Sequence, residues 1–196
     1  MAFVIRKSTV ADLDAIEDTY DFARDYMAAH GNPTQWIAYP QRELIENDIA
    51  AGVSYVLEDA RNVGVAGNVE DAGKVGDAGD AGDEAGAAIC GVFALFEGPD
   101  PTYAVIEDGA WLNDEPYMVI HRIARAQNAH GIVDAAVRFA ASFKPHMTNV
   151  RIDTHAHNLP MQRALEKLGF TRCGIIYVSD DISDHEPRIA YQKSFA

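Results

Sequence analysis

Six consecutive residues stand where a protein could bind an anion through its backbone. They follow the predicted strand 115–124 and are Asn128, Ala129, His130, Gly131, Ile132 and Val133. Apolar residues then recur at helical spacing up to residue 143, which predicts a strand, a turn and the start of a helix. At such a junction the first N–H groups of the helix point away from the sheet and can bind a phosphate. We therefore interpret the turn as a pyrophosphate-binding site, although many strand–turn–helix junctions bind nothing.

Two other groups of polar side chains raise the question of a metal ion. His155 and His157 lie close to Asp153 at the end of a predicted strand, but polar side chains often crowd a strand end. Within residues 60–87, aspartates recur every third residue. Calcium loops instead place their ligands on alternate residues and close with a bidentate carboxylate. We therefore predict no metal site.

The composition indicates a folded and acidic chain. Its 196 residues, 48% of them hydrophobic, are enough for one domain with a sizeable core. The formal net charge of −14 argues against binding to nucleic acid or to an acidic membrane, which needs a basic surface. Cys90 and Cys173 lie far apart in apolar runs, so we expect buried thiols. No apolar run is long enough to span a membrane, and a soluble cytoplasmic protein is expected.

The segment 60–87 has a composition unlike the rest of the chain. Asp-Ala-Gly recurs at positions 71, 77 and 80, and the segment contains no proline, so a collagen helix is not expected. Such a composition buries too little to order itself and predicts a low-complexity surface loop. We expect it to be an insertion in a single domain that spans residues 1–196, because closing a long loop adds only a small entropic cost.

The remaining patterns predict the order of helices and strands. Thr9 to Asp12 resemble a capping box before the first helix, and Asn158 can cap the last one. We expect strands at 2–7, 53–58, 88–96, 115–124, 150–154, 173–178 and 188–193, and helices at about 13–30, 41–51, 131–143 and 158–168. The two strands that flank helix 131–143 should be parallel, with a right-handed crossover. The fold class that follows is α/β (α+β), a mixed and mostly antiparallel twisted sheet with helices on both faces.

This order resembles that of the GNAT N-acetyltransferase superfamily. The run Asn158-x-x-Met161-x-x-Ala164-Leu165-Glu166-Lys167-Leu168-Gly169-Phe170 is similar to the second conserved segment of that family, and residues 120–133 are similar to its acetyl-CoA-binding segment. The resemblance covers the chain apart from the insertion. The turn departs from the family pattern, with Asn128 in place of Arg or Gln and Val133 in place of Gly or Ala. Leu165 stands where many members carry a tyrosine that acts as general acid.

The resemblance implies an acetyl-CoA-dependent N-acetyltransferase in which a primary amine of a small molecule or peptide attacks the thioester directly. It implies that the turn 128–133 binds the pyrophosphate and that the backbone of Ile123 and Ala124 pairs with the pantetheine arm. Asn158 would help to hold the cofactor, and the first helix and Trp36 would line the acceptor pocket.

Three side chains are candidates for moving protons in this reaction. His121 lies two residues before Ile123, and an imidazole titrates in the useful range, so it is our candidate base. A hydrogen-bonded structural histidine is the alternative. Glu107 could face the amine directly or through water, or it could be a solvated loop charge. Tyr177 could replace the missing tyrosine acid, or it could pack in the core.

Two other classes of function fit the sequence. The first is a non-catalytic CoA-binding or protein-interaction module on the same fold, which Leu165 and the altered turn favour. The second is an interaction protein that binds through the acidic segment 60–87. For any of these functions, exposed edge strands could support a homodimer.

Overall fold

A computed structural model describes residues 2–61, 88–144, 146–180 and 183–195 of the chain. The elements follow the order expected from the sequence. They are β1 (Phe3–Lys7), the 3-10 helix η1 (Val10–Asp12), α1 (Leu13–Ala29), α2 (Arg42–Ala50), β2 (Ser54–Asp59), β3 (Ile89–Glu97), the 3-10 helix η2 (Pro101–Tyr103), β4 (Tyr117–Arg125), α3 (Ile132–Phe143), β5 (Asn149–His155), α4 (Leu159–Lys167), β6 (Thr171–Asp180) and β7 (Ser183–Ser194). The predicted insertion lies outside the described residues, except for its first two residues.

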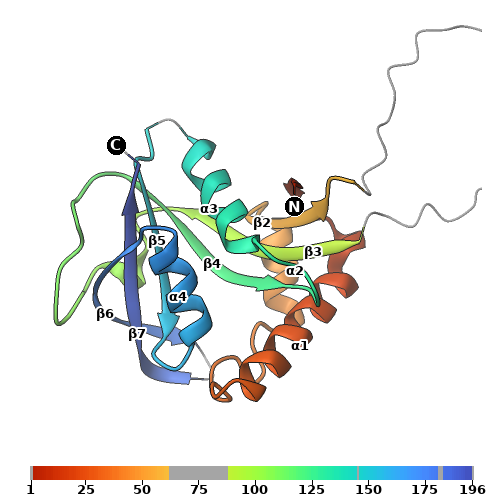
Figure 1. Ribbon diagram of the computed structural model, residues 1–196, viewed down its shortest axis with the longest axis horizontal. Coiled ribbons are helices and arrows are strands. Elements are labelled where there is room, and N and C mark those ends of the chain that lie inside the picture. Colours follow the sequence, from red (N-terminus) through yellow and green to blue (C-terminus); the bar gives the residue numbers. More distant parts are fainter. Residues whose placement is uncertain (1, 62–87, 145, 181–182, 196) are drawn as a thin grey trace, which may run out of the picture.

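The strands form one seven-stranded sheet in the order β1-β2-β3-β4-β5-β7-β6 (Figure 1). All neighbouring strands are antiparallel except β4 and β5, which are parallel and are joined through α3. The predicted parallel pair and the mixed, mostly antiparallel sheet are therefore confirmed.

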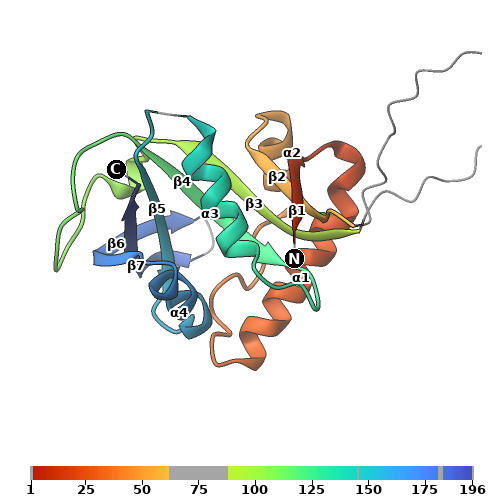
Figure 2. The same ribbon diagram turned by 45° about the horizontal axis from the view of Figure 1, so that its top comes forward.

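Helices cover both faces of this sheet, as predicted. One face is packed by α1 and α2, whose Ile16, Tyr20 and Ile45 meet Val56 and Val92. The opposite face is packed by α3 and α4, and α3 crosses in front of β3 and β4 in Figure 2. A third cluster lies beside η2, where the buried Tyr103 meets β4, β6 and β7.

The start of the first helix is fixed by a network of charges. The predicted capping box is present, because the backbone N–H of Thr9 donates to Asp12 Oδ2 at 2.7 Å. Arg6 donates to both carboxylate oxygens of Asp12 at 2.7 Å, and to Glu58 on β2 at 3.0 Å. These bonds from Arg6 lower the pKa of Asp12 to about 2. The network holds β1, β2 and the start of α1 together.

A bulge distorts β4 near its middle. On β3 Val92 pairs with Ala124 and Ala94 pairs with His121, so two residues of β4 face one residue of β3. One of these two residues, Arg122, has a φ of 51°, which is uncommon for a side chain of this size. The bulge therefore turns the side chain of Arg122 out of the regular alternation.

The last hairpin is longer than the sequence indicated. We expected a connection over residues 179–187, but β6 reaches Asp180 and β7 begins at Ser183. Backbone pairing continues there, with Val178 opposite Glu186, without the apolar alternation that marks a strand in a sequence. Both cysteines are free thiols, and Cys173 is buried as expected, whereas Cys90 is only partly buried. In the parts of the chain that the structure describes, no helix has the length and apolar character needed to cross a membrane.

Candidate active site

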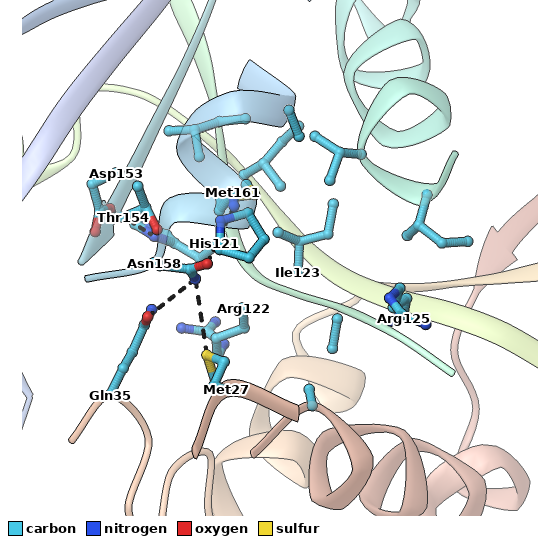
Figure 3. A pocket seen from close by; sticks show the side chains of 18 of the residues that line it. Met27, Gln35, His121, Arg122, Ile123, Arg125, Asp153, Thr154, Asn158 and Met161 are labelled. Carbon is cyan, nitrogen blue, oxygen red and sulfur yellow. Dashed lines mark hydrogen bonds and ion pairs between the residues drawn. The ribbon is translucent and has the colours of Figure 1, made fainter. Parts of the chain in front are cut away.

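The parallel strands β4 and β5 separate after a short paired region. Pairing joins Tyr117, Met118 and Val119 to the first three residues of β5 and then stops. A cavity of about 1010 Å³ lies at this separation, lined by residues of α1, β4, β5, α3 and α4 and of the segment between α1 and α2 (Figure 3). Its size is at the upper end of the range for ligand sites, so it could hold a large cofactor together with part of a second substrate.

One end of the cavity lies at the start of α3, where the backbone could accept an anion. Gly131 precedes α3 with a φ of 85°, and this residue provides no side-chain cap for the helix. The first N–H groups of α3 are therefore free of a side-chain acceptor and carry the positive end of the helix dipole. Arg125, Arg138 and Lys167 also line the cavity, and Arg138 is paired with Asp134 in the first turn of α3.

The middle of the cavity runs between the edge of β4 and the start of α4. Ile123 and Ala124 line it beyond the last residue of β4 that pairs with β5. Across from them, Asn158 caps α4 by accepting a hydrogen bond from the backbone N–H of Met161 at 3.2 Å. The Nδ2 of Asn158 donates to Gln35 Oε1 at 3.1 Å (Figure 3), which ties α4 to the segment after α1.

His121 stands in the cavity wall between two aspartates. Its Nε2 lies 2.7 Å from Asp100 Oδ2, and its Nδ1 lies 3.8 Å from Asp153 Oδ1. The hydroxyl of Tyr103 donates to that same Asp153 oxygen at 2.7 Å. Burial, mainly, and the nearby Asp153 raise the pKa of Tyr103 well above its usual value, so Tyr103 remains a proton donor to Asp153.

The ionisation of Asp100 fixes the tautomer of His121. Burial by itself would raise the pKa of Asp100, but hydrogen bonds from His121 and from Thr102 outweigh it and lower the pKa to about 2. An ionised carboxylate can only accept a hydrogen bond, so a neutral His121 must carry its proton on Nε2. The lone pair is then on Nδ1, which is the arrangement that a general base requires.

Arg122 forms a second charged pair in the wall of the cavity. Its Nε and Nη2 donate to the two carboxylate oxygens of Asp48 at 2.9 Å, and its Nη1 donates to the Tyr39 hydroxyl at 3.1 Å. The hydroxyl of Tyr20 in turn donates to the Arg122 carbonyl at 3.0 Å. Burial raises the pKa of Asp48, and the charge of Arg122 opposes this effect. These bonds hold the bulge of β4 against α1 and α2.

Solved structures share the fold of this chain over nearly their full length. A GNAT-family acetyltransferase from Streptococcus agalactiae superposes with a TM-score of 0.73 and 24% identity, covering 98% of this chain and 95% of that one. This chain has the GNAT fold. A GNAT-family acetyltransferase from Listeria monocytogenes superposes with a TM-score of 0.59 and 18% identity, covering 98% of this chain and 94% of that one. A chain of the NatC complex bound to Gag peptide and CoA superposes with a TM-score of 0.53 and 12% identity, covering 100% of each chain. No protein-family model matches the sequence, and no curated protein matches it.

Most of the residues predicted to bind the cofactor line the cavity of this GNAT fold. They are Ile123, Ala124, Ala129, His130, Gly131, Ile132, Val133 and Asn158. Asn128 is not among the lining residues and has a φ of 62°, so it shapes the turn. Trp36 and one side of α1 also line the cavity, where the acceptor pocket was expected.

The three candidates for moving protons are divided between two places. His121 lines the cavity. Glu107 and Tyr177 are not among its lining residues, and the Tyr177 hydroxyl donates to Glu107 Oε2 at 3.0 Å. Leu165 of α4, where many GNAT members have a tyrosine, is fully buried in the core. Of the three candidates, the structure therefore places only His121 in the wall of the cavity.

The sequence did not identify the partners of His121. The role of Asp100 as a helix cap is visible in the local sequence, because an Asp-Pro pair suggests a helix start. In the structure its side chain accepts a hydrogen bond from the backbone N–H of Thr102 at 2.8 Å and caps η2. Its bond to His121, 21 residues further on, depends on how η2 packs against β4. The pairing of Arg122 with Asp48 spans 74 residues and depends on the bulge, so no local pattern marks it.

Proposed function

We propose that this protein transfers an acetyl group from acetyl-CoA to a primary amine of a small molecule or peptide. The observation that carries the proposal is the position of His121. It lies in the wall of a cavity between two separated parallel strands, with its Nε2 bonded to an ionised aspartate and its Nδ1 available. The GNAT fold of the chain supports the choice of acyl-CoA as donor.

The cavity fits acetyl-CoA in its charge and its shape. The uncapped N–H groups of α3 and the basic residues around Gly131 would bind the pyrophosphate. The edge of β4 at Ile123 and Ala124 would pair with the amide groups of the pantetheine arm, and a backbone N–H there would polarise the thioester carbonyl. Asn158 would border the arm from the side of α4.

The reaction would proceed by direct attack of the amine. A neutral amine nitrogen forms a bond to the thioester carbon, the carbon–sulfur bond breaks, and the sulfur leaves as thiolate. His121 Nδ1 accepts the proton that the nitrogen loses, while Asp100 stabilises the imidazolium that results. Asp153 lies on the side of Nδ1 and could hold the amine beside it.

The leucine at position 165 does not prevent this chemistry. A thiol has a pKa of about 8.5, so a thiolate leaves at neutral pH without receiving a proton in the same step. The general acid of other GNAT proteins would therefore be dispensable here. Leu165 nevertheless favours a second candidate function, a CoA-binding module that does not catalyse transfer.

Two measurements separate these candidates. Calorimetry with acetyl-CoA and CoA should detect binding for both, and binding that is absent at high micromolar cofactor would contradict both. Thiol release across a panel of amines should occur only for the enzyme. Replacing His121 with alanine should then lower the rate about 100-fold at neutral pH and change the pH profile. An unaltered profile would remove His121 as the base.

A further inference from the structure

One arginine in the cavity wall has a side-chain nitrogen without a hydrogen-bond partner among the described residues. Arg188, in the middle of β7, lines the cavity and is only 4% exposed. Its Nη1 is buried and finds no hydrogen-bond acceptor among the residues that the structure describes. A buried cation without an acceptor is costly, so proteins generally pair such a group or bring a ligand to it.

The other arginines of the cavity are satisfied within the protein. Arg122 binds Asp48 with two hydrogen bonds, and Arg138 donates to Asp134 at 3.0 Å. Arg125 lies over the ring of Tyr26 at 4.7 Å and donates to a backbone carbonyl at 3.3 Å. Arg188 differs from these three because its buried Nη1 has no hydrogen-bond acceptor among the described residues.

The strand register places Arg188 on the same face of the sheet as His121. Ala190 is opposite Asp153, and Arg188 is two residues from Ala190, so Arg188 and Asp153 point to one face. Val119 is opposite Arg151, and by the same alternation His121 shares that face with Asp153.

This face is the one opposite to α3 and α4. The neighbours of Arg188 and Asp153 in sequence, Ile189 and Ile152, belong to the cluster under those two helices. The proposed anion site at the start of α3 therefore lies on one side of the separated strands, and Arg188 lies with His121 on the other. Arg188 is thus placed to meet the acceptor and not the pyrophosphate.

We propose that the acceptor is an amine that also carries a carboxylate, and that Arg188 binds this carboxylate. The inference rests on the proposed function and specifies its substrate class. A guanidinium presents donors in a planar fork that matches a carboxylate with two parallel hydrogen bonds. A bound carboxylate would give Nη1 the acceptor that the protein does not supply.

The rest of the acceptor side fits a zwitterion. Asp100 is ionised, and Asp153 faces Nδ1 of His121 at 3.8 Å, so a cationic amine would be attracted to the position where it must react. An acceptor with its ammonium group near Asp153 and its carboxylate at Arg188 would be oriented at both ends. Orientation of this kind contributes to rate as well as to binding. The ammonium would release one proton to solvent before the neutral amine attacks and His121 accepts the second.

The test compares each carboxylate with its own carboxamide. The panel contains L-leucine, L-phenylalanine, β-alanine and 4-aminobutyrate, each beside its amide, with acetyl-CoA and detection of the released thiol. We expect at least one carboxylate to exceed its amide in kcat/KM by about 10- to 100-fold, the usual effect of a hydrogen-bonded charge pair. Equal values within every pair, or higher values for the amides, would overturn the proposal.

Variants of Arg188 test whether its side chain causes the preference for carboxylates. In Arg188→Gln the ratio of carboxylate to carboxamide should fall to about one, mainly through KM, and Arg188→Lys should recover part of it. Arg172→Gln, on the exposed part of β6, makes the same replacement outside the cavity and should keep the wild-type ratio. A ratio that persists in Arg188→Gln would show that another group binds the carboxylate and would overturn the assignment.

A measurement without catalysis separates this inference from the proposed function. If no amine releases thiol, the transferase proposal fails, and binding of the same amino acids in the presence of CoA decides the role of Arg188. The carboxylates should raise the melting temperature of the wild-type protein and not that of Arg188→Gln. An equal shift in both proteins, or a shift in neither, would overturn the inference.

The stability of Arg188→Met distinguishes a ligand-binding role of Arg188 from a structural one. Because Arg188 has no described hydrogen-bond partner, an apolar side chain of similar length should leave the ligand-free melting temperature unchanged or raise it. A structural arginine would instead show a large loss of stability, and that result would count against a ligand-binding role.

Discussion

Asp100 determines which nitrogen of His121 can act as a base. The carboxylate accepts from Nε2–H at 2.7 Å, and it stays ionised because its pKa is about 2. Replacing Asp100 with asparagine would remove the charge and would allow the amide N–H₂ to donate to Nε2. The proton of a neutral His121 would then move to Nδ1, the nitrogen that accepts the proton of the amine in the proposed mechanism.

We therefore expect Asp100→Asn to lower kcat by about 100-fold while acetyl-CoA binding is retained. The tautomer can be followed through the ¹⁵N shifts of the His121 ring. Asp25→Asn, which makes the same change on the exposed side of α1, is the matched control and should keep the wild-type rate. A wild-type rate in Asp100→Asn would mean that Asp100 does not orient the base.

Asp100 should also contribute to stability in a defined pH range. Its pKa in the folded protein, about 2, is below the ordinary value of 3.8, so ionised Asp100 favours the folded state. The contribution is fully present above about pH 4 and is lost as the pH falls towards 2. With about 1.4 kcal/mol per pKa unit, it amounts to roughly 2 kcal/mol. Urea unfolding between pH 5 and 2 should show a smaller loss of stability for Asp100→Asn than for the wild type, and equal losses would contradict the assignment.

At the scale of elements, the turn before α3 decides whether an anion can bind. Gly131 has a φ of 85°, and a Cβ there would meet only Phe3 Cε2 at 4.0 Å, so a substitution is limited by backbone strain and not by space. Asp and Asn have nearly the same shape, and both tolerate this conformation better than other residues do. They differ in charge, and a negative charge at this position should weaken binding at the proposed pyrophosphate site.

We expect Gly131→Asp to weaken CoA binding at least about tenfold more than Gly131→Asn. The carboxylate of the Asp variant would repel the phosphates at the start of α3. Calorimetry with CoA measures the difference directly. Both variants should lose a similar amount of stability, about 1 kcal/mol, through the strained φ. Equal affinities in the two variants would show that the phosphates bind elsewhere.

The elements themselves could be predicted from local patterns, and the charged contacts between them could not. Apolar spacing placed α3 and α4, and the capping residues Thr9 and Asn158 marked helix starts that the structure contains. The bulge at Arg122 depends on how β4 fits between β3 and α1, because the Tyr20 hydroxyl binds the Arg122 carbonyl from 102 residues away. A contact at that separation leaves no trace in the neighbouring sequence.

At the scale of the whole molecule, the sequence indicated the GNAT order of elements and hence the separation of β4 and β5. It identified the residues of the turn and His121 because strand, turn and helix follow one another in the chain. It did not identify Asp100 or Arg188 as parts of the same cavity. Arg188 is on β7 and reaches the site only because β7 inserts between β5 and β6 in the sheet. Residues that meet through such an insertion are predictable only once the topology is known.

The topology also predicts that the segment 62–87 is not required for folding or for catalysis. On either side of it, β2 and β3 are antiparallel neighbours, with Leu57 opposite Gly91 and Glu58 opposite Ile89. A four-residue turn could therefore join Arg61 to Ala88. Shortening the connection should stabilise the protein by about 1–2 kcal/mol through loop entropy, and kcat/KM should stay within about twofold of the wild type.

The same deletion tests the remaining rival, an interaction protein that acts through its acidic segment. The segment holds six acidic residues and one lysine, so its removal changes the formal net charge from −14 to −9. If the shortened protein keeps its melting temperature and still releases thiol from acetyl-CoA with the preferred amine, the site between β4 and β5 is sufficient for the activity. If it remains folded and binds CoA but no longer turns over, the segment takes part in the function, and the cavity alone does not explain it.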